Sequence, residues 1–396
     1  MEPLKRYHSQ VVRQVSDSFY RYLYPKINWN QRMLAIKGPR GGGKTTLMLQ
    51  RIRYGRLQKP ALYLTADHHW FYRNTLFETA ESFYAEGGRY LFIDEVHKYT
   101  NWSVELKNIY DGFPDLKIVF SASSALDIYK GEADLSRRVI TYHLAGMSFR
   151  EYLVLNSHYK SESYSLDSLR QNHTEIAAEI TRSLTILPQF RNYLRVGYLP
   201  IHSESRDDEI PIRLNQVINT VIDSDLAYVE GIDSGSSAKI KKLLGVIAES
   251  APFKPNISSI ARKLDVSRES VYSWLHFLEK AGLLNLLRRE GKGVSLLQKP
   301  DKVYLENTNL SYALKENPDI GSIRESFLFS QLKNAGYEVT LPPAGDFNAG
   351  GYTIEAGGKN KTADQISGAS QPVIAADDIE TGYENKIPMW LFGFLY

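Results

Sequence analysis

The sequence predicts an α/β protein whose first domain is built on a parallel sheet, followed by a helical region and a smaller α/β domain. Short apolar runs alternate with helical patterns over residues 30–155, which is typical of parallel strands joined by helical crossovers. A glycine-rich turn at residues 38–43 separates the first run from the first helix, and a later run ends in the carboxylates of Asp94 and Glu95. The 396 residues are enough for two or three domains.

A phosphate-binding pattern, G-x-x-x-x-G-K-[ST], is matched at every specified position. The segment comprises Gly38, Pro39, Arg40, Gly41, Gly42, Gly43, Lys44, Thr45 and Thr46. The apolar run 33–36 before it predicts a buried strand, and the apolar residues after it predict the start of a helix. Strand, loop and helix are the context that such a loop requires.

The chemistry of this segment predicts ATP binding with Mg²⁺. Glycines allow successive backbone N–H groups to turn toward phosphate oxygens, and the helix start adds partial positive charge. We expect Lys44 to reach the β- and γ-phosphates and the Thr45 hydroxyl to ligate Mg²⁺. Thr46 is expected to support the helix start.

The second signal is the apolar run 90–93, which ends in the two carboxylates. This arrangement is the Walker B pattern, in which Asp94 holds the Mg²⁺ shell and Glu95 acts as general base on the attacking water. A strand that ends in exposed acids is the alternative interpretation, and the preceding phosphate-binding loop makes it less favourable. We therefore expect ATP hydrolysis.

Two further groups are candidates for the same site. The strand predicted at residues 116–124 ends in hydroxyls, and Ser123, or else Ser121, is expected to contact the γ-phosphate or the water; capping of the next helix is an equal alternative. The basic pair Arg137 and Arg138 precedes another predicted strand. Arg138, ahead of Arg137, is expected to act as an arginine finger on a neighbouring subunit, which implies a homo-oligomer.

Residues 30–155 resemble an AAA+ ATPase, above all the prokaryotic P-loop ATPases that carry an uncharacterised C-terminal domain. The resemblance rests on Trp102 soon after the acidic pair and on segments 122–124 (ASS), 135–138 (LSRR) and 145–152 (AGMSFREY). Arg137 departs from the family, which has glycine there, so the choice of finger between the two arginines stays open. The resemblance implies a sheet ordered 5-1-4-3-2 with the ligand at the carboxyl ends of the strands.

Composition sets limits on the other functions. Apolar residues make up 43% and charged residues 23% of the chain, and the net charge is only +3, so any nucleic-acid contact requires a local basic patch. The absence of cysteine excludes disulfides, thiolate zinc sites and cysteine nucleophiles. No apolar run approaches the length of a membrane span, and the N-terminus lacks a signal-peptide pattern. We expect a cytoplasmic protein without a membrane contact.

The middle of the chain predicts a helical lid and a winged helix-turn-helix. Residues 7–30 are expected to form a helix before the first strand, and residues 156–176 a polar insertion with little periodicity. Helices from about residue 176 would form a lid over the nucleotide. Residues 239–305 contain three helical patterns and then two strand-like runs, 283–288 and 293–298. DNA and a protein surface are equally plausible partners for this module.

The residues expected to face DNA lie on the third helix and in the wing. They are Arg268, Ser270, Ser273, His276, Arg288, Arg289 and Lys292. The helical face would enter the major groove, and the basic residues of the wing would meet phosphates.

The last part of the chain resembles the PD-(D/E)xK nuclease fold, including the segment 355–361 (EAGGKNK). Its candidate site comprises Glu325, Asp346, Glu355, Lys359 and Gln365. Two carboxylates would hold Mg²⁺ and the lysine would stabilise charge on the phosphate. Lys359 follows Glu355 by four positions, however, and not by the two positions that place the usual pair side by side on one strand face. The apolar residues 389–396 predict a buried terminal strand.

The predicted domains are an AAA+ core at 1–155, a helical lid and linker at 156–235, a winged helix-turn-helix at 236–315 and a PD-(D/E)xK nuclease-like domain at 316–396. The main hypothesis is an oligomeric, Mg²⁺-dependent ATPase that acts on DNA through the last two domains. One alternative is a nucleotide-dependent regulatory switch whose C-terminal half binds a protein. Another is a nuclease gated by ATP.

Overall fold

The computed structural model describes residues 1–124, 135, 137–201, 205–250, 252, 254–291 and 299–396. The chain divides into two compact units, Met1–Gly146 and Met147–Tyr396. Within the described ranges, no helix is both long and apolar enough to cross a bilayer.

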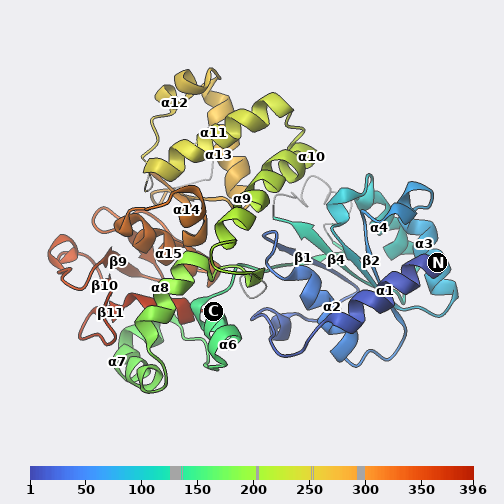
Figure 1. Ribbon diagram of the computed structural model, residues 1–396, viewed down its shortest axis with the longest axis horizontal. Helices are drawn as coiled ribbons and strands as arrows, with labels where there is room; N and C mark the ends of the chain where they lie inside the picture. Colours follow the sequence, from blue (N-terminus) through green and yellow to red (C-terminus); the bar gives the residue numbers. More distant parts are fainter. Residues whose placement is uncertain (125–134, 136, 202–204, 251, 253, 292–298) are drawn as a thin grey trace. The chain divides into compact units, whose positions relative to one another are not determined.

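The first unit is a five-stranded parallel sheet with helices on its faces (Figure 1). Its strands are β1 (Met33–Gly38), β2 (Ala61–Thr65), β3 (Tyr90–Asp94), β4 (Lys117–Ser123) and β5 (Ile140–His143). Their order is β2-β3-β4-β1-β5, which confirms the order implied by the resemblance. The strands β1, β3 and β4 are almost wholly buried, as expected for a parallel sheet covered on both sides.

The helical segments of this unit connect the strands. They are α1 (Glu2–Gln14), η1 (Tyr24–Lys26), α2 (Lys44–Tyr54), η2 (His69–Tyr72), α3 (Leu76–Ala85), η3 (Val96–Lys98) and α4 (Trp102–Gly112). The helix predicted at 7–30 is wrong in extent, because α1 begins with Pro3 in its first turn and ends at Gln14. Ser16 Oγ accepts a hydrogen bond from Ser18 N, and such local bonds compete with a helix.

The second unit begins with helices and ends in a small mixed sheet. The helices before the sheet domain are α6 (Phe149–Ser157), α7 (Leu166–Ser183), α8 (Ile186–Val196), α9 (Ile210–Thr220), the π-helical turn η5 (Val221–Leu226) and α10 (Ala227–Glu230). The polar insertion predicted at 156–176 is wrong from Leu166 on, since α7 starts there behind the capping residue Ser165. Its buried stripe includes His173, a polar residue that interrupts the apolar pattern in the sequence.

The winged helix-turn-helix pattern corresponds to α11 (Ser234–Ser250), α12 (Ile257–Leu264), α13 (Arg268–Lys280), β6 (Leu284–Leu287) and β7 (Lys302–Leu305). Ser267 caps α13, because its side chain accepts a hydrogen bond from Ser270 N. The strand that pairs with β6 is β7, in antiparallel register. The second wing run predicted at 293–298 lies outside the described residues.

The C-terminal part contains α14 (Thr308–Leu314), α15 (Ile320–Asn334), β8 (Phe347–Ala349), β9 (Tyr352–Gly357), η6 (Asp364–Ile366), β10 (Pro372–Ala376), β11 (Lys386–Pro388) and η7 (Met389–Phe394). Its sheet is ordered β11-β10-β9-β8, with only the β8–β9 pair antiparallel. Residues 337–341 make isolated bridges and no strand. The terminal segment is buried as predicted but forms the 3₁₀ turn η7 instead of a strand.

One hydrophobic core joins the first and last elements of the second unit. Phe149 of α6 and Phe190 of α8 pack with Phe327 of α15 and Phe394 of η7. Clustered aromatic rings of this size dominate the energy of a core. The helices of the predicted lid therefore share their core with the C-terminal sheet. Their position over a nucleotide stays a prediction, as do the limits of the four domains.

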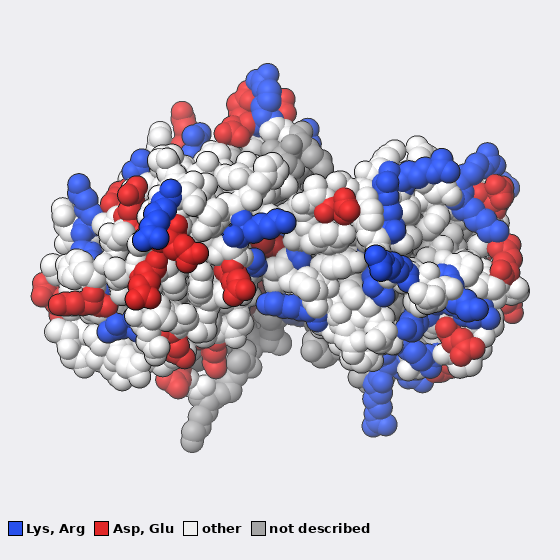
Figure 2. Space-filling view, turned by 90° about the horizontal axis from the view of Figure 1, so that it is seen from below, with Lys and Arg blue, Asp and Glu red and all other residues white. Residues whose placement is uncertain are grey.

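Charge is distributed unevenly between the two units. The first has 21 Lys and Arg against 14 Asp and Glu, a net charge of +7, whereas the second has 27 against 31, a net charge of −4. Figure 2 shows Lys and Arg predominating over the first unit. A basic unit around a glycine-rich loop suits an anionic ligand.

Candidate nucleotide-binding site

The glycine-rich loop connects the end of β1 at Gly38 to the start of α2 at Lys44. Gly41 and Gly43 have φ values of 76° and 93°, a left-handed conformation that favours glycine. A Cβ on Gly38 would lie 2.3 Å from the carbonyl oxygen of Leu144. These glycines are therefore required by the shape of the loop and by its close approach to the chain after β5.

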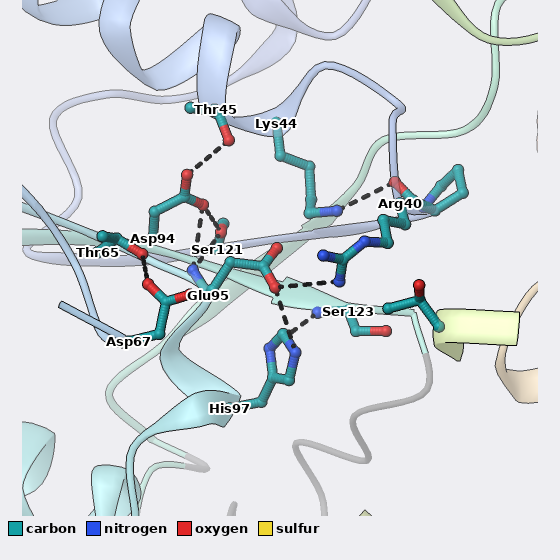
Figure 3. Close-up of polar contacts among 12 residues, drawn as sticks. Arg40, Lys44, Thr45, Thr65, Asp67, Asp94, Glu95, His97, Ser121 and Ser123 are labelled. Carbon is teal, nitrogen blue, oxygen red and sulfur yellow. Dashed lines mark hydrogen bonds and ion pairs between the residues drawn. The ribbon is translucent and has the colours of Figure 1, made fainter. Parts of the chain in front are cut away.

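Lys44 is the first residue of α2, and its side chain turns back into the glycine-rich loop. Its Nζ donates to the carbonyl oxygens of Gly38 and Pro39 at 2.9 and 3.0 Å, and the residue is 6% exposed (Figure 3). The ammonium group is thus held at the mouth of the loop, where a phosphate-binding lysine is needed.

Arg21 fixes the loop from outside and was not singled out from the sequence. Its buried guanidinium donates to the carbonyl oxygens of Gly42 and, at 2.7 Å, of Ala145. No motif marks Arg21, because its partners lie 21 and 124 residues away. It ties the glycine-rich loop to the segment after β5.

Thr45 and Asp94 form the centre of the candidate metal site. Thr45 Oγ1 donates to Asp94 Oδ2 at 2.5 Å, and Tyr63 OH donates to the same oxygen at 2.8 Å. Ser121 Oγ donates to the other carboxylate oxygen. Hydroxyl and carboxylate oxygens are the hard ligands that Mg²⁺ prefers, so the donor set fits this ion. Thr45 and Asp94 are the residues that would hold it.

Two tyrosines lie behind this carboxylate. Tyr63 of β2 is buried, and burial together with the negative charge of Asp94 raises its pKa well above the usual value. The ring of Tyr7 from α1 stacks on Tyr63 at 6.1 Å between centroids, and burial raises the pKa of Tyr7 as well. Both phenols therefore stay protonated at neutral pH, so that Tyr63 can donate to Asp94.

Glu95 lies between a residue of the loop and a buried histidine (Figure 3). Its Oε2 is 3.4 Å from His97 Nε2 and 3.9 Å from Arg40 Nη1. Glu95 has a φ of 52°, an uncommon left-handed conformation for a residue other than glycine. Its backbone N–H donates to Ser121 Oγ at 3.0 Å, and this bond anchors the turn.

The two candidate serines have different surroundings. Ser121 contacts Asp94 and the backbone of Glu95, which is a supporting role. Ser123 ends β4 and its backbone N–H donates to His97 Nδ1 at 3.5 Å. The capping alternative for Ser123 concerns a segment outside the described residues.

Arg138 is paired with Asp111 in the last turn of α4. The guanidinium Nε and Nη2 donate to the two carboxylate oxygens at 3.0 and 2.9 Å. This bidentate pair uses two of the five N–H donors of the guanidinium group and fixes its plane. Arg137 is exposed.

His68 and His69, which are neighbours in the sequence, stack on each other. The described residues contain no group of His and carboxylates arranged as a metal site.

A comparison with protein families agrees with this geometry. The family model described as an AAA domain matches residues 30–153, the range that contains the loop, Asp94 and Glu95. Residues 30–153 are an AAA domain. A second model, described as a domain of unknown function (DUF8612), matches residues 187–320.

A relative resembles the chain over nearly its whole length. The uncharacterised protein MJ1637 of Methanocaldococcus jannaschii is 24% identical over 420 residues, which cover 97% of this chain and 86% of that protein. The similarity thus extends beyond the AAA domain of this chain to the region after it.

Three solved structures match at low similarity. DnaA of Aquifex aeolicus bound to AMPPCP is 13% identical with a TM-score of 0.27, covering 70% of this chain and 88% of that one. The Saccharomyces cerevisiae Hsp104–ADP complex is 15% identical with a TM-score of 0.27, covering 69% and 39%. PCH-2 of Caenorhabditis elegans is 18% identical with a TM-score of 0.24, covering 44% and 46%.

Outside the AAA domain, the acidic residues predicted near the C-terminus do come together, but around two lysines. Lys302 Nζ lies 3.1 Å from Glu325 and 3.3 Å from Asp346. Glu355 pairs with Lys361 at 2.5 Å, and Lys361 also donates to Gln365. The predicted Lys359 contributes its carbonyl oxygen to Lys386. The lysine beside Glu355 is thus Lys361 and not the candidate Lys359, because the chain turns after β9 and brings Lys361 back.

The pKa values in this cluster follow its charges. Burial raises the pKa of Glu325, and the negative charge of Asp346 raises it further. Burial alone would lower the pKa of Lys302, but the charges of Glu325 and Asp346 outweigh it and the pKa is raised. Lys302 is thus held as an ammonium group between the two carboxylates.

Proposed function

We propose that the protein binds ATP with Mg²⁺ and hydrolyses it in the AAA domain. The observation that carries this proposal is the convergence of Lys44, Thr45 and Asp94 at the carboxyl edge of the sheet. Backbone N–H groups of residues 41–46 would cradle the phosphates. Bound Mg²⁺ would neutralise charge on the phosphate oxygens.

Glu95 is the residue that we assign as general base. It follows Asp94 directly, and its side chain is 24% exposed, so that it remains accessible to a water molecule. Ser123 lies at the end of the strand between β1 and β3, which supports a contact with the γ-phosphate or the water.

The proposal is tested by measuring ATP binding and ATP turnover separately. We expect Lys44→Ala to lose binding of a fluorescent ATP analogue, and Glu95→Gln to keep binding but lose kcat by about 100-fold or more. Lys59→Ala, at an exposed position after α2, is the matched control and should retain both. Unchanged turnover in Glu95→Gln, or binding that survives Lys44→Ala, contradicts the proposal.

We further propose that the protein forms a homo-oligomer in which Arg138 acts on the nucleotide of a neighbouring subunit. The bidentate pair with Asp111 supports this role because it orients the guanidinium group in advance of any contact. Arg137, which is exposed, is the alternative finger.

DNA is the partner that we propose for the helix-turn-helix. Three exposed basic residues lie close together in the sequence: Arg262 and Lys263 at the end of α12 and Arg268 at the start of α13. In helix-turn-helix motifs, this turn faces the DNA backbone and the major groove.

The predicted wing contacts are less suitable: Arg288 pairs with Glu279 and Arg289 with Asp301. Lys292 lies outside the described residues. A protein partner in a nucleotide-dependent switch is the competing possibility.

Nuclease activity is not part of the proposal. A metal-dependent nuclease needs a cation between its carboxylates, and here Lys302 supplies an ammonium group at that position. The described residues contain no cluster of three His or carboxylate groups suited to a metal ion. This arrangement favours a structural role for the cluster.

A further inference from the structure

His97 lies in the short turn η3, immediately after the acidic pair and Val96, and its side chain is 0% exposed. An imidazole that is removed from water in this way is costly unless its ring nitrogens face polar partners. The partners of His97 therefore indicate why the sequence places a histidine here.

The two ring nitrogens of His97 face different residues. Nδ1 is 3.5 Å from the backbone N–H of Ser123 at the end of β4, which is a donor. A nitrogen that accepts a hydrogen bond carries no proton, so the neutral ring carries its proton on Nε2. Nε2 lies 3.4 Å from Glu95 Oε2, and Figure 3 shows the ring between the two residues.

Ser123 is connected in turn to the phosphate-binding loop. In the parallel register of β1 and β4, Ser123 is the partner of Gly38, the residue with which the loop begins. A continuous chain of contacts thus links the start of the loop to Glu95. It runs from the loop backbone through the end of β4 and the His97 ring to the Glu95 carboxylate.

We propose that His97 is a positioning residue, which holds the Glu95 carboxylate in a fixed place relative to the end of β4 and the phosphate-binding loop. The inference rests on the proposed role of Glu95 as general base. His97 does not contact the reacting groups in this proposal. It acts through Glu95, by restricting the directions in which the carboxylate can point.

The other neighbour of Glu95 is less suited to this task. Arg40 Nη1 is 3.9 Å from the same carboxylate oxygen, and the Arg40 side chain is 40% exposed. Ion pairs between exposed groups are weak and screened by salt. A rigid buried ring defines a position more sharply than a long exposed side chain, because fewer rotamers have to be excluded.

The test separates positioning from nucleotide binding and from folding. We expect His97→Ala to lower kcat by about tenfold to 100-fold, as misplacement of a reacting group does, while the KM and the Kd for ATP stay unchanged. Gln is long enough to offer an amide donor to Glu95, so His97→Gln should recover most of the lost kcat. His97→Asn is too short to reach both partners and should not.

The double variant His97→Ala with Glu95→Gln provides the decisive comparison. If His97 acts through Glu95, its removal should not slow Glu95→Gln further. His69→Ala, an exposed histidine of the same unit, is the matched control and should leave kcat unchanged. Thermal unfolding of each variant shows whether it is folded. If His97→Ala fails to fold, the test is the comparison of kcat between His97→Gln and His97→Asn.

Three outcomes would overturn the inference: a wild-type kcat in His97→Ala, equal kcat values in the Gln and Asn variants, or an additional loss in the double variant. Each of these is distinct from failure of the proposed function. That failure would appear as turnover that does not depend on Glu95 at all.

Discussion

Thr45 Oγ1 and Asp94 Oδ2 lie 2.5 Å apart although 49 residues separate them in the chain. The sheet topology explains this approach. The loop before Thr45 leaves β1 and Asp94 ends β3, and β4 is the one strand between them in the sheet. Ser121 of β4 can therefore contact the same carboxylate. A threonine hydroxyl and a carboxylate that meet at this edge provide the ligands for a hard cation.

The Tyr63 hydroxyl is predicted to orient Asp94 for metal binding. Tyr63→Phe removes the donor to Asp94 Oδ2, and loss of a hydrogen bond to a charged group costs about 1.5–3 kcal/mol of unfolding free energy. We also expect ATP turnover to require a higher Mg²⁺ concentration, because the carboxylate loses one of its fixed partners. Chemical denaturation and a Mg²⁺ titration of kcat measure the two effects.

A matched control for this prediction is Tyr72→Phe. Tyr72 is 86% exposed in the same unit, and its substitution should change neither the stability nor the Mg²⁺ requirement. A Tyr63→Phe variant with wild-type Mg²⁺ dependence would show that Thr45 and Ser121 are sufficient to orient Asp94.

The finger assignment predicts complementation between two inactive variants. Arg138→Ala should bind ATP but hydrolyse it poorly, by about 10³-fold or more below wild type. Glu95→Gln should do the same for a different reason. In a mixed oligomer, a subunit with an intact Glu95 can receive Arg138 from its Glu95→Gln neighbour, so mixing the two should restore part of the turnover.

Arg137→Ala is the comparison variant, because Arg137 is the adjacent and exposed arginine. If Arg137→Ala is the inactive variant and complements instead, the finger is Arg137. Turnover that stays absent in every mixture argues that the arginine acts within its own chain, or only supports α4 through Asp111.

The sequence correctly predicted the strand, glycine-rich turn and helix around Lys44, the acidic pair at a strand end and the strand order, because each depends on a local pattern or on the family resemblance. It did not indicate Arg21, Tyr63 or His97. Their partners are distant in the sequence, as in the bond between Tyr63 and Asp94 across 31 residues, and no spacing rule connects them. Such contacts become visible only once the strand order and register are known.

The same limit applied to the second unit. The first part of helix α7, before residue 176, escaped prediction because His173 stands in its buried stripe. The sequence did not indicate that Lys361 pairs with Glu355, because this pairing depends on how the chain turns after β9. Gly357 and Lys361 are packed together there, since a Cβ on Gly357 would lie 2.5 Å from the Lys361 side chain.

DNA binding through the helix-turn-helix is predicted to depend on salt. We expect fluorescence anisotropy with duplex DNA to show an affinity that falls as salt concentration rises, since each neutralised phosphate releases counterions. Removing one phosphate contact, in Lys263→Ala or Arg268→Ala, should weaken binding and reduce the slope of log K against log salt by about one. Arg206→Ala is the control, because Arg206 is exposed in the same unit and paired with Asp208.

Two results would contradict this prediction. Wild-type protein that binds no DNA at low salt would favour a protein partner for α12 and α13. Binding that is unaffected by Lys263→Ala and Arg268→Ala would place the DNA contact on another surface, such as the basic first unit.

The lysine-centred cluster predicts a stability effect with a defined pH dependence. Lys302→Met leaves Glu325 and Asp346 without their shared cation. Removing one partner of a buried ion pair costs about 3–5 kcal/mol of unfolding free energy, and the exposed fractions of 16–17% here place the expected loss toward the lower value. Lys315→Met, which breaks a pair with the more exposed Glu249, should cost under about 1 kcal/mol.

The sign of the pH dependence follows from the raised pKa values. The pKa of Lys302 is raised in the folded protein, so its contribution is fully present at neutral pH and is lost only above the usual lysine pKa. The pKa of Glu325 is also raised, so the folded state favours its protonated form, and a charged Glu325 costs stability as pH rises through that pKa. The deficit of Lys302→Met should therefore be large at pH 7 and shrink as the carboxylates are protonated in acid. Urea denaturation at pH 4 and pH 7 measures this loss of unfolding free energy. An equal loss at both pH values would show that Lys302 stabilises the fold through packing of its aliphatic stem and not through its charge.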